Sequence, residues 1–457
     1  MARISKRNKA QSHDSESPQM ETPLSGQPER KESRLYKGVW GVLAVELLRL
    51  AVGGIFLFSG FVKAIDPWGS VYKFGEYLSV FGFSEFDWIL PFMSFTLSTA
   101  EFMLGVFMVL GIYRRFTPFA MLLAMTVMLP LTGYLAITDA VPDCGCFGDA
   151  IVLGNWTTFF KNLLLVPAIL YLCAFNRRVK NIYGFAVQWL VAFFSLTYAL
   201  VVAFVGYYYQ PMLDFRPYPV GSHISQQPAA DGASDAANYQ FVYEKDGNRA
   251  TFTIDSLPDD TWTFVDRKLR PGVRQSSASA EGVAITQVDG DPADGVIRDS
   301  GEQLLFIFSD MKAVGISYTY LINEIYDYAE SHGIYVVGLT SASEEEIEEW
   351  NDLSMASYAL FTVDDSVLKM IARGNPAVVY LKDGRVKWKR TLQSVSMELI
   401  SSSREMADIA ADFDARKWLY GLTSTYIMAM VLLLIVNRTH LLWKIRIKSN
   451  NKTKNKA

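Results

Sequence analysis

Two cysteines stand one residue apart in the segment VPDCGCFGDA, residues 141–150, and the chain has only three cysteines. Cys144 and Cys146 reach each other only through a tight bend, for which Gly145 supplies the backbone freedom. A disulfide that closes so short a ring is strained, and strain makes it more reducible and more oxidising. The spacing therefore predicts thiol–disulfide exchange at this pair.

Three other interpretations of the pair stay open: a static loop staple, half of a metal site, or an inert reduced pair. A metal site needs further ligands at suitable spacing. His223 and His332 are the histidines predicted on the same side of the membrane, and neither has ligand spacing to the cysteines. No metal is therefore expected.

Charged residues in or beside apolar segments are the second candidates. Lys63 and Lys161 lie near the ends of such segments, where a cation beside a thiol favours the reactive thiolate. Lys63 and Asp66 are also expected to snorkel to the membrane surface. Glu101 falls in the middle of a segment, where an ionisable group needs a partner or a function. It is interpreted as a proton relay or quinone contact, or as a buried ion pair or protonated carboxyl that fixes helix packing.

Long apolar segments must position these residues, and half of the chain is apolar. Their length and low charge predict a multi-span α-helical membrane bundle of four or five spans plus a C-terminal span. The predicted spans are 39–62, 89–113, 116–137, 156–175, 182–209 and 419–436.

The lysines and arginines outside these spans form four clusters, all on one side of a six-span arrangement. The positive-inside rule makes that side cytoplasmic, so both termini are predicted to be cytoplasmic and residues 210–415 extracytoplasmic. The expected location is a bacterial cytoplasmic (inner) membrane. Cys173 then lies on the order of 25 Å from Cys146, across the bilayer, and cannot pair with it.

The composition of residues 210–415 bears on partners. This stretch has 33 acidic and 17 basic residues, and so acidic a surface argues against nucleic acid as a partner. Membrane lipid and exported or envelope proteins are the expected partners.

Composition shifts divide the chain into six predicted parts. They are a disordered cytoplasmic tail (1–35), a transmembrane domain (36–209), a linker and small β unit (210–300), an α/β domain (301–414), a C-terminal transmembrane helix (418–437) and a basic cytoplasmic tail (438–457). In the β unit, a hairpin is predicted around Asp246-Gly247-Asn248 and a short strand in VAITQV, 283–288. In the α/β domain, strands alternate with helices, and Asp383-Gly384 predicts a hairpin turn.

The membrane block resembles the DoxX/MauE family. The likeness rests on LLRLAVGGIFLFSGFVKAIDPWG, STAEFMLGVFMVLGIYRR and LTGYLAITDAVPDCGCFGDAIVLGNWTTFFKN, about 140 residues in all. The resemblance implies a four-helix membrane core tied to thiol–disulfide chemistry, with Cys144 and Cys146 as the redox pair. It also implies a link to quinones through DoxX relatives, while Arg49, Lys63, Glu101, Asn155 and Trp156 carry over as family-typical positions without assigned chemistry.

Residues 302–413 are similar to a thioredoxin-like domain of the TlpA type in element order, and Asn375-Pro376 stands where that fold keeps a proline beside its active site. Such domains carry Cys-x-x-Cys after the first core strand, whereas this chain has FSDMKAVGIS, residues 308–317. The predicted extracytoplasmic domain is therefore unable to do dithiol chemistry by itself.

Two classes of function follow. The first is a membrane thiol–disulfide oxidoreductase, or an accessory subunit of one, that exchanges electrons between Cys144/Cys146 and exported protein thiols, with a quinone or a partner protein as the candidate that reoxidises or reduces the pair. The second is a non-enzymatic envelope scaffold in which the two cysteines form a structural loop disulfide. A small-solute transporter is a third idea, supported by Glu101 alone.

Overall fold

The computed structural model describes residues 39–141, 143–227, 239–245, 248–253, 256–258, 262–269, 282–403, 405–409 and 413–454. The chain divides into two compact units, Met1–Ala44 and Val45–Ala457, and the contacts below are internal to the second. The predicted disordered tail lies outside the described residues. So do residues 228–238 of the predicted linker and the predicted turn residues Asp246 and Gly247.

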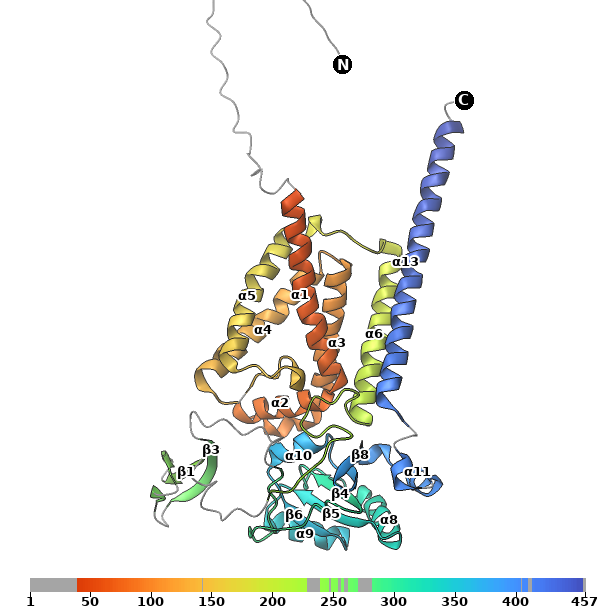
Figure 1. Cartoon of the computed structure of the whole chain (residues 1–457). Coiled ribbons are helices and arrows are strands. Elements are labelled where there is room, and N and C mark those ends of the chain that lie inside the picture. Colours follow the sequence, from red (N-terminus) through yellow and green to blue (C-terminus); the bar gives the residue numbers. More distant parts are fainter. Residues whose placement is uncertain are drawn as a thin grey trace, which may run out of the picture. The chain divides into compact units, whose positions relative to one another are not determined.

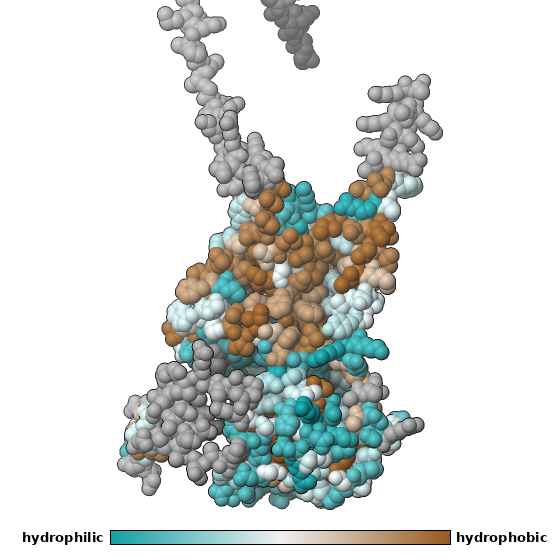
Figure 2. Space-filling view, viewed as in Figure 1, coloured by the Kyte–Doolittle hydropathy of each residue, from teal (hydrophilic) through white to brown (hydrophobic). Residues whose placement is uncertain are grey.

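Within the described residues, six helices are long and apolar enough to cross a membrane, which confirms the predicted helical membrane bundle (Figure 1). Figure 2 shows apolar residues gathered over these helices and polar residues over the α/β region. The spanning helices are α1 (Val39–Ile65), α3 (Leu90–Leu110), α4 (Thr117–Thr138), α5 (Asn155–Ala174), α6 (Phe185–Tyr208) and α13 (Ala415–Lys454).

Residues 63–88, between the first two predicted spans, would form an outer loop in the six-span arrangement, but the structure shows that they are mostly helical. Helix α1 continues to Ile65, and α2 (Pro67–Val80) and the short helix η2 (Ser84–Ile89) follow. Asp66 caps α2 by accepting a hydrogen bond from the Gly69 amide, and Pro67 occupies the first helical position, where no amide hydrogen is needed. In Figure 1, α2 runs across the direction of the long helices.

The membrane helices pack in two groups around separate apolar clusters. Residues of α1, α3, α4 and α5 share one cluster, and residues of α1, α3, α6 and α13 share the other. Helices α6 and α13 are also joined by hydroxyl hydrogen bonds between Tyr198 and Thr423 and between Ser195 and Tyr426. Because α1 and α3 contribute to the same cluster, their facing residues are brought into close contact.

The α/β region contains a five-stranded mixed sheet, compatible with the predicted α/β domain. Its strand order is β6-β5-β4-β7-β8, with β4, β5 and β6 parallel and β7 antiparallel to both β4 and β8. The strands are β4 (Glu302–Phe308), β5 (Tyr335–Thr340), β6 (Ala359–Thr362), β7 (Ala377–Lys382) and β8 (Arg385–Thr391). The predicted turn at Asp383-Gly384 joins β7 to β8, with both residues at positive φ.

Helices cover both faces of this sheet. Alternate residues of β4 enter two apolar clusters, one shared with α8 (Ser317–Ser331), α9 (Glu344–Ser354) and α11 (Met397–Ser402), the other with α10 (Asp365–Ile371). A buried sheet explains why β4 is a continuous apolar run rather than an alternating one.

A separate three-stranded antiparallel sheet has the order β2-β1-β3, from β1 (Tyr239–Lys245), β2 (Asn248–Phe252) and β3 (Thr263–Leu269). Its first two strands are those predicted around the Asp246-Gly247 turn. The strand predicted in VAITQV does not form, because only Val283 and Thr286 make isolated bridges there.

Candidate functional site

The Cys144–Cys146 segment forms a tight bend between α4 and α5. Gly145 has φ +60°, the left-handed conformation that glycine adopts without a steric cost. Both cysteines are free thiols, with their Sγ atoms 2.9 Å apart. A disulfide requires about 2.05 Å, so a small movement of the two side chains joins them.

Side chains from three helices fix this bend by hydrogen bonds to its backbone and ion pairs to its flank. Ser59 on α1 donates to the Cys146 carbonyl (2.6 Å), and Tyr77 on α2 donates to the Cys144 carbonyl (2.7 Å). Lys73 on α2 forms an ion pair with Asp143 (3.1 Å). Asn155 on α5 donates a hydrogen bond to the Val141 carbonyl (2.8 Å), three residues before Cys144. The bend is therefore held without a covalent bond.

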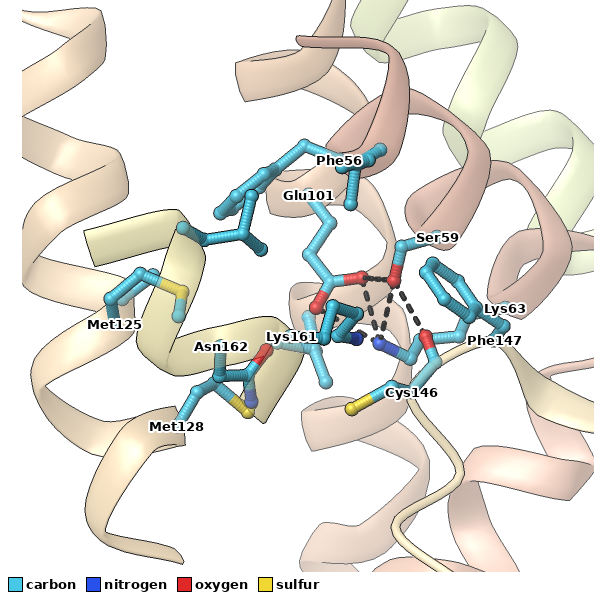
Figure 3. Close-up of a pocket in the computed structure, with 14 residues that line it drawn as sticks. Phe56, Ser59, Lys63, Glu101, Met125, Met128, Cys146, Phe147, Lys161 and Asn162 are labelled. Atoms are coloured by element: carbon cyan, nitrogen blue, oxygen red, sulfur yellow. Dashed lines mark hydrogen bonds and ion pairs between the residues drawn. The ribbon is translucent and has the colours of Figure 1, made fainter. Parts of the chain in front are cut away.

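A buried ion pair lies beside Cys146. Lys63 on α1 donates to both carboxylate oxygens of Glu101 on α3, at 2.7 and 2.9 Å. The single hydroxyl hydrogen of Ser59 is shared between this carboxylate, at 2.7 Å, and the Cys146 carbonyl. Figure 3 shows the Lys63 ammonium group among Glu101, Ser59 and the Cys146 backbone, while the Cys146 side chain points toward Asn162 and Met128. Ser59 therefore connects the ion pair to the cysteine bend.

Two glycines allow the close approach of α1 and α3 that this ion pair needs. A Cβ atom on Gly60 would lie 2.1 Å from the Phe102 amide nitrogen, and one on Gly105 would lie 2.3 Å from the Leu57 amide nitrogen. No side chain fits at such distances. The two backbones therefore touch, as small residues permit in membrane helices.

The two thiols differ in their proton affinity. The hydrogen bond shared with Cys144, together with the ammonium groups of Lys161 and Lys63, lowers the pKa of Cys146 to about 6 against the effect of burial. The same shared hydrogen bond and burial raise the pKa of Cys144. Lys161 also lies over the Phe147 ring, 4.3 Å from its centroid. Of the two thiols, Cys146 therefore favours the thiolate form more strongly, and Cys144 favours the protonated form.

Two small cavities flank the pair. The first, of about 50 Å³, reaches Cys146 and is lined by polar and apolar side chains that include Lys63, Glu101 and Lys161. The second, of about 40 Å³, reaches Cys144 and is lined also by Lys73 and Tyr77. Each cavity has room for only a few water-sized molecules.

The structure brings together all five candidates from the sequence: Cys144, Cys146, Lys63, Glu101 and Lys161. The expectation that Lys63 and Asp66 snorkel is wrong for Lys63, whose side chain is 6% exposed because Glu101 neutralises it inside the bundle. Among the described residues, no group of three or more metal-ligating side chains is found.

The remaining family-typical positions have structural contacts away from the pair. Arg49 pairs with Glu46 and donates to carbonyl groups at the end of α3, while Trp156 is exposed on α5. Cys173 lies near the far end of α5, in a different apolar cluster from the pair.

Sequence reasoning missed Ser59, Lys73 and Tyr77. Ser59 and Lys63 are four residues apart on α1, and Lys73 and Tyr77 are four apart on α2, so each couple lies on one helix face. The four-residue spacing was therefore the signal that could have identified these residues. For Lys73 and Tyr77 it becomes visible only if residues 63–88 are first recognised as helical.

Six candidate spans and a buried charged site define a helical membrane protein. Residues 42–174 match the family model of methylamine utilisation protein MauE, so this part of the chain is a MauE-like membrane domain. The match ends with α5 and leaves α6 and α13 outside. Residues 237–271 match a domain of unknown function, DUF8463. No curated protein and no solved structure matches the chain.

Proposed function

We propose that the MauE-like domain is a membrane thiol–disulfide redox module, in which Cys144 and Cys146 exchange electrons with the thiols of exported proteins. The observation that carries this proposal is the pair itself: two free thiols 2.9 Å apart, with the pKa of Cys146 lowered by its hydrogen bond with Cys144 and by the neighbouring lysines. A thiolate next to a thiol is the arrangement that dithiol exchange requires.

The contacts of the bend favour exchange over a structural staple. A staple is useful where a loop lacks other restraints, whereas this bend is held by Ser59, Lys73 and Tyr77. The bend keeps its position whether the pair is oxidised or reduced, as a repeatedly cycling redox centre needs.

The proposed reaction has two steps. The Cys146 thiolate attacks a partner disulfide, forming a mixed disulfide and releasing one partner thiolate. Cys144 then loses its proton and attacks the Cys146 sulfur, which forms the Cys144–Cys146 disulfide and releases the second partner thiol. Two electrons pass from the pair to the partner, and the reverse sequence oxidises a partner dithiol.

The α/β region contributes binding rather than redox chemistry in this proposal, because it contains no cysteine. Its proposed thioredoxin-like character and extracytoplasmic position suit a surface that holds exported proteins near the membrane pair. The chain would then lie in a bacterial inner membrane with the cysteine bend on the outer side.

A quinone, implied by the resemblance to DoxX relatives, does not fit the cavity beside Cys146. That cavity measures about 50 Å³, whereas pockets for organic ligands measure roughly 300 Å³ or more. No step of the proposed reaction therefore runs through a quinone.

Trapping in intact cells tests the proposal. Cys144→Ser leaves Cys146 able to attack but removes the thiol that resolves the mixed disulfide, so we expect partner adducts on Cys146 that a reducing agent releases. The matched control, Cys146→Ser, should trap far less, and Cys173→Ser should behave as wild type. A pair that is always oxidised, with a potential well below about −300 mV, would instead identify a staple and favour the scaffold function.

A further inference from the structure

One arginine of the α/β region contacts the membrane domain on both sides of the thiol bend. Arg373 lies between α10 and β7, with its side chain 6% exposed. Its guanidinium donates to Asp66, with N–O distances of 2.8 and 3.0 Å, and also pairs with Asp149. Asp66 follows Lys63 by three residues, and Asp149 follows Cys146 by three residues.

Further hydrogen bonds hold the segment around this arginine. Gln210, just after α6, accepts from the Arg373 amide (3.0 Å) and donates to the Arg373 carbonyl (2.6 Å). The guanidinium also donates to the Lys369 carbonyl (3.1 Å), and the Gly374 amide donates to the Tyr72 hydroxyl on α2 (3.2 Å). This segment is thus tied both to the α/β region and to the membrane helices beside the thiol bend.

The two thiols offer little room to a folded partner while these contacts persist. Cys144 is buried, at 7% exposed, and Cys146 is half-buried beside a cavity of only about 50 Å³. Thiol–disulfide exchange needs direct contact between the attacking sulfur and the disulfide. A protein disulfide therefore gains room at Cys146 when the bend moves away from the bundle.

We propose that Arg373 is a latch by which the α/β region holds the thiol bend closed, and that its release admits a protein partner to Cys146. This inference rests on the proposed redox function, and it gives the α/β region a second role, control of access. Arg373 is a positioning residue that acts on the thiols through Asp149.

The latch depends on the positive charge of Arg373 and on the negative charges of Asp66 and Asp149. Asp66 and Asp149 both face the guanidinium and raise the pKa of Arg373 against the effect of burial, so the arginine stays charged. Without it, the two carboxylates repel each other, and Arg216 is left as the cation that acts on Asp149. Removal of the positive charge therefore replaces attraction by repulsion between the end of α1 and the thiol bend.

The test compares labelling of the thiols by a bulky and a small reagent. The full chain in membrane vesicles, with Cys173→Ser so that only the pair reacts, is treated with polyethylene-glycol maleimide or N-ethylmaleimide. We expect Arg373→Gln to raise the ratio of bulky to small labelling rates by about tenfold or more, because labelling follows the open population. Arg373→Lys should keep most of the closed state, and Arg385→Gln, at an exposed arginine of the same region, should match wild type.

A charge exchange separates release of the latch from general unfolding. Arg373→Asp combined with Asp149→Arg restores opposite charges, and we expect its labelling ratio to return toward the wild-type value. An unchanged ratio in Arg373→Gln overturns the latch, and so does a raised ratio that the exchange fails to lower. Because labelling needs no partner protein, the latch can fail while the trapping experiment on Cys144→Ser succeeds, and the reverse.

Discussion

Lys63 on α1 and Glu101 on α3 form an ion pair inside the membrane-spanning bundle, with Nζ–Oε distances of 2.7 and 2.9 Å. Their side chains are 6% and 12% exposed, so both charges are largely removed from water. Each charge is tolerable there only in the presence of the other. This pair, through Ser59, joins the cysteine bend to the packing of the two helices.

Glu101→Gln should destabilise the protein by about 3–5 kcal/mol, because it leaves the Lys63 charge buried without a counter-ion. Thermal unfolding of the detergent-solubilised protein measures this change. Lys63→Met combined with Glu101→Leu should recover much of the loss by removing both charges. Glu324→Gln, on the exposed surface of α8, is the control, and an unchanged midpoint for Glu101→Gln would falsify the buried pair.

Gly105→Ala should cost about 1–3 kcal/mol, because the added methyl group would lie 2.3 Å from the Leu57 amide nitrogen and force α1 and α3 apart. Gly54→Ala, on the same helix as Leu57, has no atom within 4 Å of the new Cβ and should be neutral or slightly stabilising. Unfolding midpoints of the two variants provide the comparison. Equal midpoints would mean that the two helices do not touch as described.

Cys146 should react with iodoacetamide as a thiolate down to about pH 6, since its pKa is lowered to about 6. Its rate should fall as the pH drops through this value, whereas the rate at Cys144, whose pKa is raised, should still be rising at pH 9. Mass spectrometry of the labelled peptides separates the two. Lys161→Met should move the Cys146 midpoint upward, and a midpoint that stays near 6 would exclude a contribution from Lys161.

Tyr77→Phe should loosen the cysteine bend with little effect on the helices. The lost hydrogen bond to the Cys144 carbonyl contributes about 0.5–1.5 kcal/mol, and its loss should speed backbone hydrogen exchange in residues 143–149. Tyr320→Phe removes an exposed hydroxyl on α8 and is the matched control. Identical exchange in both variants would argue that the Tyr77 contact does not hold the bend.

The large elements were predictable because their signals are local. Each membrane span can be recognised from its length and its low charge. The β7–β8 hairpin can be recognised from Asp383-Gly384 at its turn. The cysteine pair was identified in the same way, from two thiols around one glycine. Its role in redox chemistry stays a prediction.

The parts that escaped prediction depend on contacts distant in sequence. Lys63 was expected at the membrane surface because nothing local marks Glu101, 38 residues later, as its partner. Gly60 and Gly105 are ordinary helix glycines until α1 and α3 meet. Helix α2 gives no clear helical signal in the sequence because it is short and mixed in polarity. Lys73 and Tyr77 lie on this helix, so the sequence does not mark them as site residues either.

Helix α13 runs for 40 residues without a break, through the predicted C-terminal span and on through the basic residues after it. At 1.5 Å per residue it is about 60 Å long, roughly twice the thickness of the hydrocarbon core of a bilayer. Its last turns, after Trp443, extend about 16 Å beyond the candidate span. An unbroken helix carries the backbone of residues 444–454 steadily away from the end of the candidate span, whereas a flexible tail would let the same residues fold back toward it.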